Sequence, residues 1–185
     1  MKFGRAVANG SNKNAGRAAV KAQRRAMSTE SQSSLTIRRA DSNDGEAIVA
    51  CLAAAFAPYS NSYTPAAFTD TVLDPRLVQH RLREMCVFVA VSEGNVVGTV
   101  ACGATGEEGH LRGMAVLPDW QGSGVASALL QAAEAEIRKQ RCKRITLDTT
   151  EPLARAMRFY AHHGFTLSGV SDFFGMPLRE WVKFL

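Results

Sequence analysis

The sequence predicts one mixed α/β (α+β) domain, in which a mostly antiparallel central sheet is flanked by helices. Three observations predict it. Strand-like and helix-like stretches alternate from residue 35 to residue 185, the short turn Glu93-Gly94-Asn95 joins two strand-like runs, and a Gly-rich loop leads from a strand directly into an amphipathic helix. The resulting order of elements is β-α-α-β-β-β-α-β-α-β-β.

The first part of the domain is predicted to contain one strand and two helices. The run Leu35-Thr36-Ile37-Arg38 alternates as a strand does, and Asp41, Ser42 and Asp44 supply the side-chain oxygens that commonly begin a helix. Apolar residues then recur at helical spacing between positions 47 and 55. A loop rich in turn residues follows at 58–65, and a second helix is expected at about 76–85.

The second part begins with a hairpin formed by the runs 87–91 and 96–101. The other elements follow in chain order: a turn at 103–109, a strand at 110–117 that Pro118 ends, a helix at 125–140, a strand at 144–148, a helix between Pro152 and Gly164, and closing strands at 165–167 and 179–184. The helix at 125–140 carries its apolar residues on one face, namely Val125, Leu129, Leu130, Ala133 and Ile137.

Residues 1–34 are expected to form a disordered, basic extension before the domain at 35–185. Seven of the 22 Lys and Arg residues lie in residues 1–29, where there is no Asp or Glu. The rest of the chain carries the other 15 basic residues and all 17 acidic ones, so the net charge of +5 belongs to the extension and not to the domain. We therefore expect no nucleic-acid partner for the domain. The extension suits either an organellar transit peptide or an upstream addition to a protein that starts at Met27.

Composition also bears on membranes, metals and compartment. No apolar run approaches the roughly 18 residues needed to span a bilayer, so we expect no membrane partner. The four cysteines lie far apart in apolar surroundings and without the spacing of a zinc site: Cys51, Cys86, Cys102 and Cys142. They are predicted to be buried, reduced thiols in a cytoplasmic protein without a metal, or in an organellar one if residues 1–29 are a transit peptide.

The segment Met114–Ala126 carries the strongest functional signal. A strand runs into a Gly-rich loop and then into a helix, whose free N–H groups and dipole form an anion site. Gly122 and Gly124 would let a phosphate approach the backbone. A Walker loop would need a Lys that Ser123-Gly124-Val125 does not provide, and a dinucleotide fingerprint would need a third Gly where Ser127 stands.

The run Gln121-Gly122-Ser123-Gly124-Val125-Ala126 resembles the acetyl-CoA signature of the GNAT (Gcn5-related N-acetyltransferase) superfamily. The strand before it, with Met114, Ala115 and Val116, and the helix ending Ala156–Phe165 are similar to further parts of that family. The resemblance covers about 35–185. It implies a GNAT fold, acetyl-CoA as co-substrate and an N-acetyltransferase that acts on a primary amine of a small molecule or peptide in a ternary complex.

The resemblance also suggests catalytic residues. Tyr160 stands where the family often has the acid that protonates the leaving thiolate, a role that suits a phenol; the alternative is a core aromatic packed beside Phe159. The base is open: His110 and Glu108 lie where the family often places a Glu, and Asp148 is a further candidate. Leu153 replaces an Asn that often contacts the cofactor.

The acceptor side is expected between the first helix pair and the C-terminal loop. The residues proposed there are Tyr59, Tyr63, Asp148, Asp172 and Phe173. Aromatic walls with a carboxylate suit a small cationic or amphipathic amine. Two alternatives to an active enzyme remain: a degenerate domain that binds acyl-CoA as a sensor or interaction module, and nucleic-acid binding by residues 1–29. A homodimer is a candidate assembly.

Overall fold

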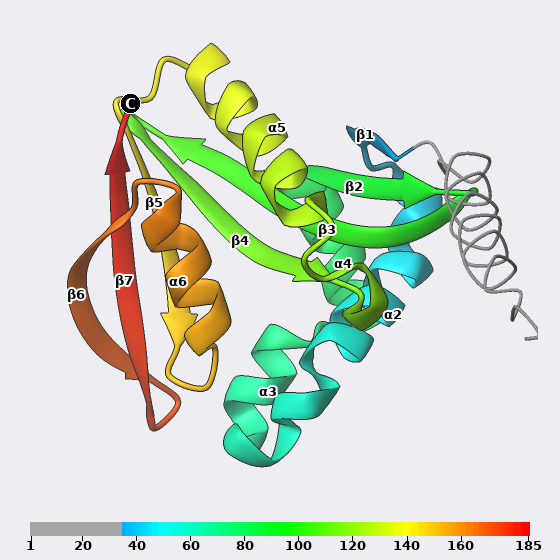
Figure 1. Cartoon of the computed structure of the whole chain (residues 1–185), viewed down its shortest axis with the longest axis horizontal. Coiled ribbons are helices and arrows are strands. Elements are labelled where there is room, and N and C mark those ends of the chain that lie inside the picture. Colours follow the sequence, from blue (N-terminus) through cyan, green and yellow to red (C-terminus); the bar gives the residue numbers. More distant parts are fainter. Residues whose placement is uncertain (1–34) are drawn as a thin grey trace, which may run out of the picture. The chain divides into compact units, whose positions relative to one another are not determined.

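A computed structural model describes residues 35–185, so the predicted disorder of residues 1–34 lies outside the described residues. The described chain forms a seven-stranded mixed sheet of order β1-β2-β3-β4-β5-β7-β6 (Figure 1). Its strands are β1 (Thr36–Arg39), β2 (Cys86–Ser92), β3 (Asn95–Thr105), β4 (Glu108–Val116), β5 (Arg144–Thr150), β6 (Thr166–Phe173) and β7 (Met176–Phe184). Only β4 and β5 pair in parallel, which confirms the largely antiparallel sheet.

Within residues 35–185, five α-helices accompany the sheet. They are α2 (Gly45–Phe56), α3 (Pro65–Thr71), α4 (Pro75–Glu84), α5 (Val125–Lys139) and α6 (Ala154–His162). None of these helices of residues 35–185 is both long and apolar enough to cross a membrane. The predicted helix start after β1 is confirmed: Asp41 caps the turn at Asn43, and Asp44 accepts hydrogen bonds from the Asp41 amide at 2.9 Å and from Arg38 at 2.7 Å.

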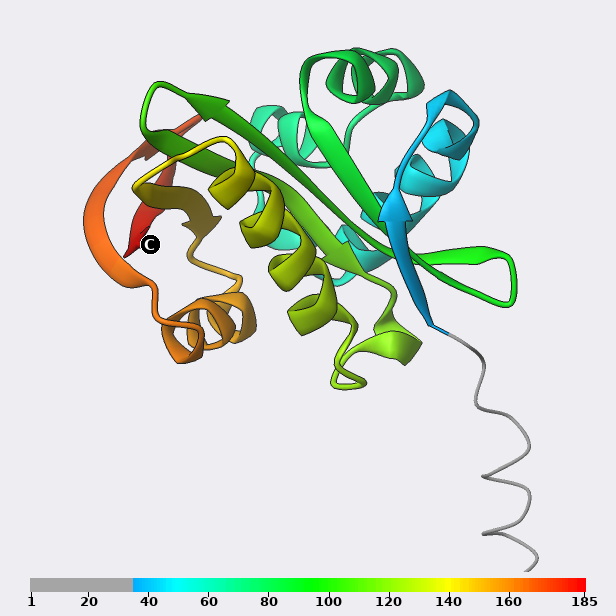
Figure 2. The ribbon, with the colours of Figure 1, turned by 90° about the horizontal axis from the view of Figure 1, so that it is seen from above.

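The sheet separates two hydrophobic cores. Because successive side chains of a strand point to opposite faces, neighbouring residues of one strand enter different cores. Val100 packs with α5, whose five predicted apolar residues are all buried, whereas Ala101 packs with α2 and Val78 of α4 on the other face (Figure 2). The four cysteines are buried, as predicted. The helix α6 completes the α5 core with Tyr160.

The strands β4 and β5 separate after only four paired residues. Glu108–Leu111 pairs with Arg144–Leu147, and beyond this point β5 continues with β7 alone (Figure 1). The cause lies in β4, where the register with β3 shifts between Thr99 and Ala101 and Gly113 adopts a φ of 62°. A bulge of this kind bends a strand, and its left-handed residue is usually Gly. The result is a gap in the middle of the sheet.

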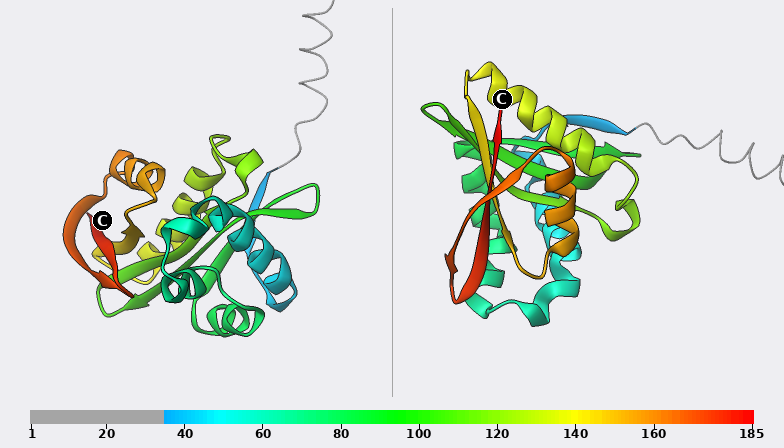
Figure 3. Two further views of the ribbon diagram at one scale, coloured as in Figure 1. Left: turned by 90° about the horizontal axis from the view of Figure 1, so that it is seen from below. Right: turned by 60° about the vertical axis from the view of Figure 1, so that its left-hand side comes forward.

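Several predicted boundaries need correction. The helix α3 was missed, and the predicted loop at 58–65 contains the 3₁₀ helix Ala57–Ser62. The predicted turn at 103–109 is mostly strand, because β3 and β4 pair down to Thr105 and Glu108. Both closing strands are longer than predicted because they pair with each other as a hairpin. The turn of that hairpin reaches α3, where the Thr64 hydroxyl donates to the Phe174 carbonyl at 2.9 Å (Figure 3).

Candidate active site

Two cavities lie at the gap between β4 and β5. One has a volume of about 370 Å³ and follows β4 to the start of α5; the other, of about 280 Å³, lies among β4, β5 and the helices α3 and α4. Both are lined by the same five residues, which therefore mark where the cavities meet: Phe56, Met114, Leu153, Ala156 and Tyr160. Two molecules bound in the two cavities would face each other there.

The larger cavity ends at the Gly-rich loop. Gly122 and Gly124 have φ values of 87° and 92°, a region that favours Gly, and α5 begins directly afterwards at Val125. A Cβ on Gly124 would meet no atom within 4 Å, so the backbone there is open. The Arg155 guanidinium donates to the Gln121 side chain at 2.8 Å and lies beside Gly122. The loop thus combines free helix N–H groups with a cation, which suits a phosphate.

Most residues proposed for the cofactor line this cavity. They are Met114, Ala115, Val116, Gln121, Gly122, Gly124, Ala126 and Tyr160. Ser123 does not, because its exposed hydroxyl donates to the Trp120 carbonyl at 2.6 Å, and the Val125 side chain is directed into the core, where it is 1% exposed. The Ser123 N–H also donates to the Trp120 carbonyl, at 3.4 Å, so of these two residues only Val125 keeps a backbone N–H available to a ligand.

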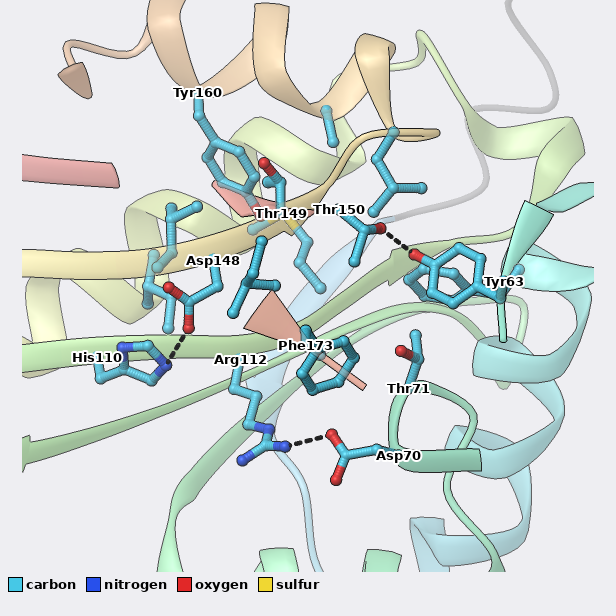
Figure 4. A pocket seen from close by; sticks show the side chains of 18 of the residues that line it. Tyr63, Asp70, Thr71, His110, Arg112, Asp148, Thr149, Thr150, Tyr160 and Phe173 are labelled. Carbon is cyan, nitrogen blue, oxygen red and sulfur yellow. Dashed lines mark hydrogen bonds and ion pairs between the residues drawn. The ribbon is translucent and has the colours of Figure 1, made fainter. Parts of the chain in front are cut away.

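The smaller cavity holds three polar pairs (Figure 4). His110 of β4 and Asp148 of β5 face one another with 3.7 Å between Nε2 and Oδ2, and the other ring nitrogen of His110 lies 3.0 Å from the Thr146 hydroxyl. Across the cavity, the Arg112 guanidinium donates to Asp70 of α3 at 2.6 Å. The third pair joins the hydroxyls of Tyr63 and Thr150.

Burial shifts the pKa of several groups in the cavities, Asp148 and Tyr160 among them. Desolvation raises the pKa of Asp148; Glu180 adds to the increase and His110 opposes it. Desolvation alone raises the pKa of Tyr160, so that its phenol stays protonated at neutral pH. The Tyr160 hydroxyl donates to the Met114 sulfur at 3.6 Å, a weak contact that a better acceptor could replace.

Comparison with known proteins agrees with this geometry. The model of the acetyltransferase (GNAT) family matches residues 39–165. The chain belongs to this family. It is therefore a GNAT acetyltransferase, as the Gly-rich loop predicted.

Two individual proteins are similar to this chain in sequence, and a solved structure is similar in fold. An aminoglycoside N(6')-acetyltransferase type 1 of Stenotrophomonas maltophilia is 31% identical, over 53% of this chain and 76% of that protein. The N-acetylaspartate synthetase of Rattus norvegicus is 34% identical over 50% of this chain, which spans only 31% of that longer protein. The solved PaiA N-acetyltransferase of Thermoplasma acidophilum in complex with coenzyme A is similar in fold, with a TM-score of 0.70 and 14% identity over 82% of this chain and 99% of that one.

Some GNAT-based expectations are not met by the geometry. Glu108 does not line either cavity, because its carboxylate binds Arg144 at 2.6 Å and Thr146 at 3.1 Å, and these bonds lower its pKa. Asp172 also lies outside both, since its carboxylate accepts the Gly175 amide at 3.1 Å within the β6–β7 turn. Tyr59 lines the larger cavity and not the smaller one, whereas Tyr63 and Phe173 line the smaller one as expected.

Four charged residues of the GNAT site were missed by sequence reasoning. They are Asp70, Arg81, Arg112 and Arg155, which come from α3, α4, β4 and α6. Each is an ordinary surface residue type, and no spacing in the sequence relates one to another. Arg112 gave the only usable signal, because it stands two residues after His110 and so lies on the same face of the strand.

Proposed function

We propose that the protein transfers an acetyl group from acetyl-CoA to a primary amine of a small molecule or peptide, by direct attack in a ternary complex. One observation supports this most: the cavity that ends at the phosphate-type loop and the cavity that holds His110 and Asp148 meet at Met114 and Tyr160. A donor and an acceptor could thus be held with their reacting atoms adjacent.

The donor would bind along the larger cavity. The N–H groups of Gly122, Gly124, Val125 and Ala126 and the Arg155 guanidinium would hold the pyrophosphate. Beyond Leu111, the edge of β4 that faces β5 has no strand partner within residues 35–185, so the amides of a pantetheine arm could pair with it. Bound there, acetyl-CoA supplies an activated thioester carbonyl. A backbone N–H near Met114 would stabilise the negative charge that develops on the carbonyl oxygen.

The acceptor would bind in the smaller cavity beside His110. His110 would accept the proton that the amine loses, and Asp148 would stabilise the imidazolium. Tyr160 would donate its phenolic proton to the sulfur as the C–S bond breaks, and the apolar surroundings that raise its pKa also make a thiolate more basic. The C–N bond of the product forms as the C–S bond breaks and free CoA leaves. The proton that His110 took from the amine then passes through solvent to Tyr160, which restores both residues to their starting states.

A covalent enzyme intermediate is not required. No cysteine is among the described residues that line either cavity, and all four are buried. Burial raises the pKa of Cys51 to about 11 and that of Cys102 to about 12, which disfavours the nucleophilic thiolate. Direct transfer from acetyl-CoA to the amine is the simpler route.

Titration calorimetry of the full chain with acetyl-CoA, CoA, ATP and NAD tests the donor site. We expect binding of the two CoA compounds only. Release of CoA thiol in the presence of a panel of amines, amino acids and peptides then tests the reaction. CoA binding without thiol release from any acceptor would favour the degenerate, acyl-CoA-binding alternative, in which Leu153 replaces a polar cofactor contact; a preference for ATP or NAD would refute the donor site.

A further inference from the structure

The smaller cavity contains a guanidinium that has no ion-pair partner among the described residues. Arg81 and Arg112 both line this cavity, together with the carboxylates of Asp70 and Asp148, and Asp148 faces His110. Asp70 is already bound to Arg112 at 2.6 Å. Within residues 35–185, no carboxylate lies close enough to Arg81 to form an ion pair, and no described acceptor takes a hydrogen bond from its guanidinium.

The position of Arg81 is built into the fold. Its side chain extends from the last turn of α4 to the bulge of β4, where a Cβ on Gly113 would overlap the guanidinium. Gly113 thus serves both the bend of β4 and the placement of this charge. Arg81 is half-buried, and its pKa falls to about 10 because burial and the like charge of Arg112 both disfavour the protonated form, while Asp70 favours it. At neutral pH the side chain is still a cation.

A half-buried cation beside a second cation is costly unless an anion joins it. A ligand carboxylate would relieve this cost, because its two oxygens match the planar fork of a guanidinium. The free charge is a single one, which suits a carboxylate better than a doubly charged phosphate monoester. The opposite charge lies elsewhere in the same cavity, where Asp148 stands beside His110.

We infer that the acceptor is a small amine that also carries a carboxylate, as a free amino acid does, with the carboxylate held by Arg81 and the amine beside His110 and Asp148. This inference rests on the proposed function, because it names the acceptor class for the same site. The volume of about 280 Å³ is of the size that holds a small molecule. The inferred acceptor differs from the cationic amine that the sequence suggested, for which aromatic walls and a carboxylate were expected.

The test compares acceptors in matched forms with the full-length protein: free amino acids, their carboxamides and the corresponding decarboxylated amines. Thiol release gives kcat/KM for each form, and calorimetry with the CoA-loaded protein gives acceptor binding independently of turnover. The variants are Arg81→Met, which keeps length but removes charge, and Arg81→Lys, which keeps charge but removes the fork. Arg83→Met is the control, because Arg83 is an exposed cation of the same helix that lines neither cavity.

We expect the carboxylate forms to be preferred. Arg81→Met should raise their KM and their dissociation constant at least about tenfold and leave the CoA affinity unchanged, and Arg83→Met should leave all these quantities at wild-type values. Arg81→Lys should retain part of the preference. If the carboxamides or the decarboxylated amines turn over as well as the free amino acids, and Arg81→Met does not change this, the inference is overturned and the acetyltransferase proposal stays intact. If amino acids bind in a way that depends on Arg81 but are not acetylated, the carboxylate site is supported and the acetyltransferase proposal is overturned.

Discussion

Among the described side chains that line both cavities, Tyr160 alone carries an ionisable proton. Its position gives it access to both reactants, and its burial keeps it protonated. A side chain with a purely structural role would matter for stability, whereas an acid would matter for turnover. Removal of the hydroxyl can distinguish these two roles. Its one hydrogen bond goes to a thioether, a weak acceptor, so its loss should cost little stability.

We therefore predict that Tyr160→Phe lowers kcat about 10²-fold, a typical loss for a general acid, with little change in CoA affinity or melting temperature. Steady-state kinetics, calorimetry and thermal unfolding of the same preparation would measure the three quantities. An unchanged kcat would restrict Tyr160 to core packing beside Phe159.

Asp148 should affect stability and activity in opposite directions. Its pKa is raised in the folded protein, so the folded state holds the proton more tightly than the unfolded one. Stability contributed by this residue is then present below the ordinary Asp pKa and lost as the pH rises through the raised folded value. At neutral pH, Asp148→Asn should raise the free energy of unfolding and lower kcat/KM at least about tenfold through the loss of His110's partner. Urea unfolding should show the higher free energy of unfolding of Asp148→Asn at pH 7. The difference from wild type should vanish at about pH 3, where Asp148 is protonated and both side chains are neutral.

At the scale of elements, the turn before α5 allows a matched comparison. Gly124 and Gly94 have φ values of 92° and 81°, and a Cβ on either would meet no atom within 4 Å. Gly124 lines the larger cavity, whereas Gly94 lies in the β2–β3 hairpin. Gly124→Ala and Gly94→Ala should each cost about 1–2 kcal/mol of stability, since both force Ala into the left-handed region.

Only Gly124→Ala should weaken CoA binding, because it alone places a methyl group where the phosphates would approach. Calorimetry with CoA and urea unfolding of both variants would decide this. Equal CoA affinity in the two variants would show that the loop does not hold the phosphates.

The elements that could be predicted from the sequence are those with a periodic apolar pattern. The helix α5 has five buried residues on one face, so its extent and orientation were readable. The helix α3 has seven residues and only Ala67 buried, which leaves no periodicity to detect. The bulge at Gly113 was also unreadable, because the register shift is set by pairing with β3 and not by local preference.

At the scale of the molecule, the donor side was largely predictable and the acceptor side was not. Apart from Tyr160, the residues predicted to bind the donor are nearly contiguous, from Met114 to Ala126, so one motif indicates them, and most of them line the larger cavity. The acceptor cavity collects Tyr63, Asp70, Arg81, Asp148 and Phe173 from five separate elements or loops. Their meeting depends on the whole fold, and for this reason the sequence did not indicate Arg81 and did not reveal that Asp172 lies outside this cavity.

The described elements all lie within residues 35–185, and the family match begins at residue 39. We therefore predict that a protein starting at Met27 retains the melting temperature, CoA affinity and kcat of the full chain. Thermal unfolding, calorimetry and thiol-release assays of the two proteins would compare these quantities. A lower melting temperature or a lost activity in the shorter protein would assign a structural or catalytic role to residues 1–26.

The separation of β4 from β5 also bears on solubility. It leaves unpaired N–H and C=O groups of a strand in the interior of the sheet, and an open strand edge ordinarily invites another chain to pair with it and aggregate. Here that edge is recessed in a cavity whose walls include Phe56, Trp120 and Phe159. A second polypeptide strand would bring side chains on both of its faces into this recess, whereas the pantetheine arm of the proposed donor is narrower. The same recess that admits the donor would thus protect the protein from self-association through this strand.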